Sequence, residues 1–242
     1  MTLPLPTRRD ESWRYSDLDA VARVWPVETH KHFVAAGESF ARDIVIDAPD
    51  DAVCIEDHEI EIGAGASAAF RIVVAGGKLG RVFVKAQLGE GAHLDLSGAI
   101  VGGGDVTREI VTRVSHVAPN ATSAQIVRTV VGQRATGSYL GKVAVARDAQ
   151  KTDATQSAKA ILLDRTATAN LKPELEIYAD DVKCGHGATV GELDAQALFY
   201  LAARGLPPAE AKALLLRAFV SGLFDGDDAL TGAVDRALEN LL

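Results

Sequence analysis

The sequence contains few cysteines, few aromatic residues and no long apolar run. Its 242 residues include two cysteines, Cys54 and Cys184, and 5% aromatic residues. Two thiols 130 positions apart cannot form the disulfide framework of a small secreted domain, and lone thiols are typical of a reducing compartment. No segment approaches the roughly 18 apolar residues of a membrane-spanning helix, and the first residues lack the apolar stretch of a secretory signal. We therefore expect a cytoplasmic protein.

The chain also lacks an excess of positive charge. It has 33 acidic and 25 basic side chains, which give a formal net charge of −8. A negatively charged protein is repelled by phosphate backbones and by anionic membrane surfaces. We therefore expect no nucleic acid and no membrane among its partners. The 48% hydrophobic and 24% charged residues are typical of a globular protein with a substantial core.

Short alternating segments dominate the middle of the chain, from about residue 42 to residue 176. Alternation with a period of two predicts β-strands. A turn of small residues recurs between them at spacings of 26, 29, 33 and 34, in segments 63–67, 89–93, 118–122, 151–155 and 185–189. A repeat of this length, in which no copy can bury a face alone, predicts a solenoid whose neighbouring coils share one core. An antiparallel β-sandwich with similar turns is the alternative.

After residue 191 the pattern changes to helices. Leu214, Leu215 and Phe219 fall on one apolar stripe of a predicted helix that begins at Pro207-Pro208. Residues 192–242 carry 8 acidic and 4 basic side chains, a net charge of −4, which argues against a DNA-binding helix-turn-helix. We therefore predict three regions: a lead-in segment over 1–34, a β-helix core over 35–191 and a small helical domain over 192–242.

The densest group of chemically active side chains contains Cys184 and His186. In an extended segment, residues two apart project from the same face, so a thiolate and an imidazole can converge on one metal ion. Both groups are good ligands for iron or zinc. A closed zinc site needs four ligands, and the sequence has no second Cys-x-His or Cys-x-x-Cys motif to complete one. Spacing alone therefore favours a buried thiol and a hydrogen-bonded histidine, unless a second chain supplies the missing ligands.

Enzymatic alternatives have less support. A nucleophilic pair of Cys184 and His186 has no third orienting group and no evident oxyanion donor, which counts against a cysteine-dependent hydrolase. A β-solenoid enzyme acting on carbohydrate would need carboxylates that converge from several coils, and we identify no such set in the sequence. The glycine-rich segments 98–104 and 137–143 lack the pattern of a phosphate-binding loop, so we expect no ATP hydrolysis by this chain.

Residues 171–193 contain the segment Lys183-Cys-Gly-His-Gly-Ala-Thr189 and are followed by Leu198-Phe-Tyr-Leu201 and Arg204-Gly205. This stretch resembles the C-terminal signature of the SufB/SufD family of iron-sulfur cluster assembly proteins. The segments 5–18, 141–145 and 152–156 are similar to other parts of the same family. The Lys-Cys pair before Gly185-His186 resembles the SufD branch more than the SufB branch, whose corresponding turn reads His-Glu-Ala-Thr. Many members also carry a helical region ahead of the segment that residues 5–9 resemble.

The resemblance implies a mainly β fold, a right-handed parallel β-helix solenoid with a small C-terminal helical domain. It implies a non-catalytic scaffold subunit that pairs with SufB, docks the ATPase SufC, and supports iron acquisition and nascent cluster formation at the contact between SufB and SufD. On this basis Cys184 and His186 are candidate ligands for iron or a nascent iron-sulfur cluster, shared transiently with SufB. We expect no cofactor tightly bound to the isolated chain. The helix with Leu214, Leu215 and Phe219 is the candidate ATPase-docking region.

Two further expectations concern the isolated chain and the ranking of its ligands. An unpaired strand edge on the last coil tends to recruit another edge, so we expect a homodimer. His186 is expected in a turn, where exposure at an interface is easier than for a thiol closer to the packed strand. His186 is therefore the stronger candidate ligand, and Cys184 has a secondary role.

Overall fold

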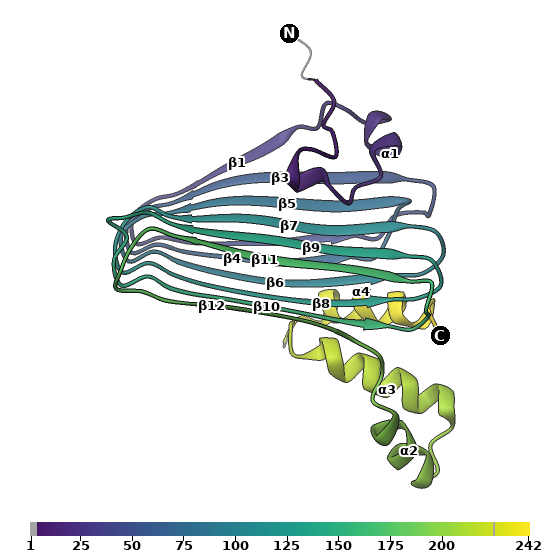
Figure 1. Cartoon of the computed structure of the whole chain (residues 1–242). Coiled ribbons are helices and arrows are strands. Elements are labelled where there is room, and N and C mark those ends of the chain that lie inside the picture. The colour runs from purple at the N-terminus through teal and green to yellow at the C-terminus, as the bar shows by residue number, and fades with distance from the viewer. Residues whose placement is uncertain (1–3, 225) are drawn as a thin grey trace.

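The computed structural model describes residues 4–224 and 226–242 and is a β-solenoid followed by helices (Figure 1). Residues 1–3 of the predicted lead-in lie outside the described residues. The strands form two six-stranded parallel sheets, and each coil contributes one strand to each sheet. The predicted mainly β solenoid is confirmed. The sandwich alternative is wrong, because neighbouring strands run parallel.

The odd-numbered strands form the first sheet, in the order β1-β3-β5-β7-β9-β11. Their bounds are Thr29–Val34, Val53–Ile62, Leu79–Leu88, Thr107–His116, Thr136–Val145 and Thr168–Ile177. The even-numbered strands form the second sheet, in the order β12-β10-β8-β6-β4-β2. From β2 to β12 their bounds are Ser39–Ile46, Ser67–Val74, His93–Gly102, Thr122–Val131, Asp153–Leu162 and Lys183–Gly191. Successive strands thus alternate between the sheets.

Alternate residues of each strand face the space between the two sheets and form the main core. In the second sheet, Phe70 of β4 is in register with Leu96 of β6, and both are buried. In the first sheet, Val82 and Ile110 form a register pair that belongs to the same buried cluster. Burial of apolar surface contributes roughly 25 cal/mol per Å². Each coil therefore gains stability mainly from the coils beside it.

The turns that lead into the second sheet stack on one another. Gly65, Gly91, Asn120 and Lys151 occupy equivalent positions with positive φ angles of 60° to 62°. Each donates its backbone N–H to a carbonyl oxygen of the next turn, at 2.6 to 3.0 Å. The left-handed conformation favours glycine, but other residues adopt it at a modest cost, asparagine most readily. The geometry of the turn therefore persists while the residue changes.

This stacking confirms the predicted turns at 63–67, 89–93 and 118–122 and corrects the other two. Lys151 is equivalent to Gly65, so the fourth copy covers 149–153 rather than 151–155. The fifth segment, 185–189, is not a turn, because it lies inside β12. Residues in register across the second sheet are 26 to 31 positions apart. The predicted turns were aligned on glycine and alanine. This alignment is wrong in the last coils of the solenoid, because Lys151 adopts the left-handed conformation there.

The segment before β1 packs against the outer face of the first sheet. Its described residues form a short 3-10 helix, η1 (Glu11–Trp13), and a short α-helix, α1 (Leu18–Ala22). Beneath it, Arg81 and Glu109 form an almost fully buried ion pair at 2.6 Å. Ser16 donates to Glu109 at 2.5 Å, and Arg81 Cζ lies 3.9 Å from the centroid of the Trp13 ring. The predicted lead-in region also contains β1, which pairs with β3.

Three helices follow β12 in the described residues: α2 (Ala195–Ala203), α3 (Pro208–Ser221) and α4 (Asp228–Glu239). α3 and α4 cover the outer face of the second sheet, and α2 lies farthest from the sheets (Figure 1). Their apolar residues form a second buried cluster with sheet residues, including Val73, Ala99, Val101, Val130, Leu216, Val220, Leu230 and Val234. No helix within the described residues is long and apolar enough to cross a membrane.

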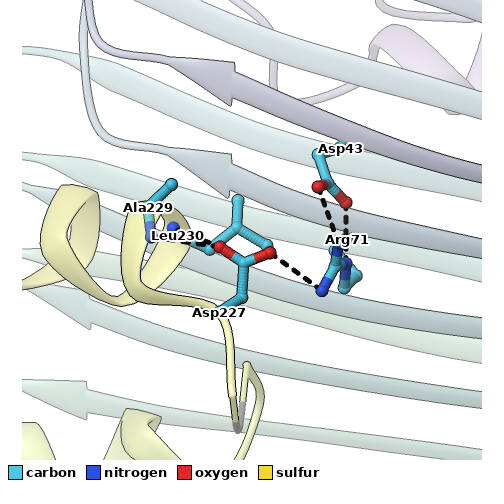
Figure 2. Close-up of polar contacts among 5 residues, drawn as sticks. All are labelled: Asp43, Arg71, Asp227, Ala229 and Leu230. Carbon is cyan, nitrogen blue, oxygen red and sulfur yellow. Dashed lines mark hydrogen bonds and ion pairs between the residues drawn. The ribbon is translucent and has the colours of Figure 1, made fainter.

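A polar clamp fixes the start of α4 to the second sheet (Figure 2). Asp227, the N-cap residue, accepts hydrogen bonds from the backbone N–H groups of Ala229 at 3.1 Å and Leu230 at 3.0 Å. Its other carboxylate oxygen lies 3.0 Å from the Arg71 guanidinium. That guanidinium also binds both carboxylate oxygens of Asp43, at 2.7 Å each. The Arg71 clamp therefore joins β2, β4 and α4.

Candidate metal half-site on the last coil

Cys184 and His186 both lie in β12, the last strand of the second sheet. Cys184 is in register with Ala154 of β10, and His186 is in register with Gln156. Ala154 and Gln156 are buried, so this row faces the space between the sheets. The two candidate ligands therefore share the core-facing side of one strand, as their spacing predicts.

His186 is exposed although its row faces inward. The reason is its place at the end of the sheet, because β12 pairs with β10 and no other described strand follows it. The predicted position of His186 in a turn is wrong, since it is the fourth residue of β12. An edge strand presents unpaired backbone groups together with its side chains. The exposed histidine thus lies on a surface that another strand can extend.

Cys184 is less accessible than His186. Its side chain is half-buried and packs against the main core. Burial raises the pKa of the Cys184 thiol, and the nearby negative charge of Asp153 adds to this effect. Metal binding needs the thiolate. The surroundings of Cys184 therefore favour His186 as the primary ligand.

The pair of Cys184 and His186, called the half-site below, supplies two ligands. Within the described residues, no group of three or more His, Cys, Asp or Glu side chains is placed to hold a metal ion. Tetrahedral sites built from cysteine and histidine use about four ligands. A complete site of this kind would need ligands beyond the two that the half-site supplies.

A buried polar group lies one strand behind the half-site and is not anticipated by the sequence analysis. Gln156, in register with His186, is 3% exposed. Its Nε2 donates to Tyr139 Oη at 3.4 Å. Gln125 Oε1 accepts hydrogen bonds from Tyr139 Oη at 3.2 Å and from Thr112 Oγ1 at 2.6 Å. We call Thr112, Gln125, Tyr139 and Gln156 the polar column.

The polar column is hard to recognise in the sequence because its residues come from four strands, β7 to β10. Gln125 and Gln156 occupy core-facing positions, where alternation alone leads us to expect apolar side chains. Burial raises the pKa of Tyr139 to about 12, so its hydroxyl stays protonated and can donate. Gly141 leaves room for this hydroxyl, since a Cβ atom there would lie 2.2 Å from Tyr139 Oη. The signal in the sequence was a glutamine within each of two predicted strands, at a position where alternation leads us to expect an apolar residue.

A family profile described as "SUF system FeS cluster assembly, SufBD core domain" matches residues 33–219. The chain belongs to the SufBD core family. The matched region contains β2 to β12, and with them the half-site and the polar column. It also contains α2 and most of α3, so the first helices after the solenoid are part of the SufBD core match.

Three curated relatives illustrate the match. The iron-sulfur cluster assembly protein SufD of Escherichia coli (strain K12) is 38% identical over 112 residues, 46% of this chain and 26% of that protein. An iron-sulfur cluster assembly SufBD family protein of Synechocystis sp. is 41% identical over 107 residues, 44% of this chain and 24% of that protein. Protein ABCI7, chloroplastic, of Arabidopsis thaliana is 36% identical over 155 residues, 63% of this chain and 33% of that protein. The matched segments span 24% to 33% of these relatives, and the predicted resemblance to SufD of the SufB/SufD family is confirmed.

The SufBD core chain distributes its candidate docking residues over two sides of α3. Leu214 is exposed and Leu215 is half-buried, whereas Phe219 packs against the cluster between helices and sheet. Phe219 therefore helps attach α3 to the solenoid. Two residues of α2 outside the predicted docking set, Phe199 and Tyr200, are 76% and 57% exposed. Four successive apolar residues at 198–201 were the signal, because one helix face cannot bury them all.

Proposed function

We propose that this chain is a non-catalytic scaffold subunit of the SUF iron-sulfur cluster assembly machinery that pairs with SufB and docks the ATPase SufC. The observation that carries the proposal is the half-site, two metal-binding side chains on the exposed edge strand of a SufBD core fold. Iron and the nascent cluster are the cargo of this site. Family membership favours this function over a carbohydrate-active solenoid enzyme and over a cysteine-dependent hydrolase.

Pairing with SufB would complete the sheet and the half-site together. β12 is the last strand of the second sheet, and its residues 185–191 are exposed. An unpaired strand edge is a template for a strand of another chain. A SufB edge placed there would bring its own side chains next to Cys184 and His186. The ligand set is then shared across the interface, which supports iron acquisition and cluster formation at that contact.

Docking of SufC is assigned to the exposed apolar surface of α2 and α3. Phe199, Tyr200 and Leu214 are exposed on these helices, and the surrounding region 192–242 has a net charge of −4. An apolar centre with a charged rim is typical of a protein interface, and an acidic rim fits a basic partner surface. Leu215 and Phe219, the other predicted docking residues, lie closer to the sheet on α3.

The proposed function is tested by coexpression of this chain with SufB and SufC. His186→Ala should leave the complex assembled, because strand pairing along β12 uses backbone groups rather than this side chain, and should lower the iron and sulfide content of the purified complex. Cys184→Ala should have a smaller effect. Thr189→Ala, an exposed position on the outward-facing row of β12, is the control and should retain normal iron. Normal iron and sulfide in the His186→Ala complex would refute the half-site, and loss of the complex would make His186 an interface residue only.

A further inference from the structure

We propose that Gln156 is a positioning residue that orients the His186 ring by accepting a hydrogen bond from one imidazole nitrogen at its Oε1. The inference rests on the function proposed above for His186 and adds a residue inside the solenoid to that site. Gln156 is 3% exposed, and its Oε1 has no hydrogen-bond partner among the described residues. Buried acceptors without a donor are rare in native proteins, so we expect a hydrogen-bond donor for this oxygen.

The place of Gln156 in the sheet points to His186 as that donor. The two residues are in register on β10 and β12, so their backbones are neighbours about 4.8 Å apart in the ladder. Both occupy the core-facing row. The nitrogen end of the Gln156 amide is already engaged with Tyr139 Oη at 3.4 Å. Its oxygen is therefore the end that remains for a neighbouring strand, and His186 is the residue of β12 in register with it.

Gln125 is the competing donor. It is in register with Gln156 on the inner side, in β8, and its Nε2 is also unpartnered in the described part of the chain. The oxygen of the Gln125 amide, however, is held by Thr112 at 2.6 Å and by Tyr139 at 3.2 Å. With Gln125 held in this way, Gln125 Nε2 and Gln156 Oε1 do not form a hydrogen bond with each other, although the two residues are in register. The polar column thus holds Gln125 in place and leaves Gln156 Oε1 available to β12.

A hydrogen bond to Gln156 would determine which nitrogen of His186 binds metal. A neutral imidazole carries one N–H group and one lone pair, and the partner of the N–H group fixes both the tautomer and the ring orientation. When the N–H group is donated to Gln156 Oε1, the lone pair of the other nitrogen is turned away from the solenoid interior. The glutamine amide is neutral, so it orients the ring without adding charge to the site.

The tautomer of His186 can be measured by ¹⁵N NMR on the full chain with labelled histidine, at a pH where the ring is neutral. We expect one dominant tautomer in the wild type. Gln156→Met keeps the length of the side chain but removes the acceptor, and should give the tautomer mixture of a free imidazole. Ser123→Ala is the matched control, because it removes a buried polar group from a core-facing position of β8 that is not in register with His186. It should leave the His186 tautomer unchanged.

Two results would overturn the proposal. A free-imidazole mixture in the wild type would do so even if Gln156→Met failed to fold. An equal shift in Ser123→Ala would also do so, because it would show a general loss of order in the core rather than the loss of one acceptor.

The coexpressed complex with SufB and SufC separates this proposal from the proposed function. Gln156→Met should retain the complex and weaken its binding of ferrous iron by about 10- to 100-fold, the usual effect of losing a group that orients a metal ligand. If His186→Ala leaves iron unchanged while Gln156→Met alters the tautomer, the proposed function fails and the positioning role stands. If His186→Ala lowers iron while Gln156→Met changes neither the tautomer nor iron, Gln156 is not a positioning residue.

Discussion

Two histidines inside the solenoid are held in their neutral form. His58 and His116 are fully buried, and burial lowers the pKa of each to about 4. For His58 the Glu56 carboxylate, 3.3 Å from the ring, partly opposes the effect of burial. In the unfolded chain histidine titrates near pH 6.5. Between about pH 6.5 and pH 4 the unfolded state therefore binds more protons than the folded state.

We expect the free energy of unfolding to fall as the pH is lowered from about 6.5 to about 4. Above about pH 6.5 both rings are neutral in the folded and the unfolded chain, so their protonation does not affect stability. Below that pH, His116 lowers the free energy of unfolding by up to about 3 kcal/mol. His116→Gln should weaken this acid dependence, as measured by urea unfolding at neutral pH and at about pH 4.5. His93→Gln, at a histidine that is not buried, is the control. An acid dependence in His116→Gln equal to that of the wild type would contradict the prediction.

The half-site could be predicted from the sequence, but its neighbour Gln156 could not. A spacing of two places Cys184 and His186 on one face of any strand, whatever its partners. Gln156 lies 30 residues earlier, and only the register of β10 with β12 makes it a neighbour of His186. The predicted exposure of His186 is right, but its cause is an edge strand rather than a turn. Periodicity gives the face of a strand and cannot give its neighbours.

At the scale of elements, the lead-in segment is held to the first sheet where Ser16 and Trp13 contact the buried pair of Arg81 and Glu109. Arg81→Met would leave the Glu109 carboxylate buried without its cation, since the two side chains pair at 2.6 Å. Removing one partner of a buried pair costs about 3–5 kcal/mol, so we expect a loss of this size in the free energy of unfolding. The double variant with Glu109→Gln should lose less than the sum of the single changes, because no buried charge remains. Strict additivity in urea unfolding would show that the two side chains are not coupled.

The start of α4 depends on a single carboxylate. Asp227 both caps the helix and binds Arg71, as Figure 2 shows. Hydrogen bonds from backbone N–H groups and the charge of Arg71 hold the pKa of Asp227 below its usual value. Asp227→Asn keeps an acceptor for the cap and loses the ion pair, whereas Asp227→Ala loses both. We expect thermal unfolding temperatures in the order wild type, Asp227→Asn, Asp227→Ala, with Asp228→Ala as the neighbouring exposed control. Equal unfolding temperatures for all four proteins would show that the Arg71 clamp does not stabilise the fold.

The repeat of the solenoid was predictable, and its last coil was not. Glycine marks the left-handed turn position at Gly65 and Gly91, so these turns can be recognised in the sequence. At Asn120 and Lys151 the same conformation is adopted without glycine, and hydrogen bonds to the next turn maintain it. A search for small residues then selects Gly185 and Gly187, which lie in a strand. Long-range hydrogen bonding, rather than local preference, sets the register at this end.

At the scale of the whole molecule, the open edge of β12 predicts self-association of the isolated chain. We expect a homodimer in light scattering at micromolar concentration. Val190→Lys, at an exposed position of β12, should shift the chain toward monomer, because edge lysines oppose strand pairing. Phe33→Lys places the same charge on β1, the edge strand of the first coil, and should leave the dimer intact. A monomeric wild type would contradict the prediction. Dissociation by Phe33→Lys but not by Val190→Lys would show that the dimer contact lies at β1 rather than at β12.

The proposed docking of SufC can be tested at the exposed aromatic residues of α2. Phe199→Ala combined with Tyr200→Ala should weaken association with SufC by about 2 kcal/mol or more, roughly 30-fold, because exposed aromatic residues at the centre of an interface contribute most of its affinity. The free energy of unfolding should change little, since both side chains are exposed. Tyr178→Ala, an exposed aromatic position next to β11, is the control in the same binding assay. Unchanged binding by the double variant would place the SufC contact elsewhere.

The position of α4 over early strands has a consequence for the order of events during translation. Val73, on the outer face of the second sheet, precedes Asp228 by 155 residues. At about 5–20 residues per second the ribosome needs about 8–30 seconds to cover that distance. During this interval the coils can already stack while their outer apolar surface stays open to water. A nascent chain that stops before α4 therefore leaves the ribosome with that surface uncovered, a feature by which a chaperone or protease can distinguish it from the finished protein.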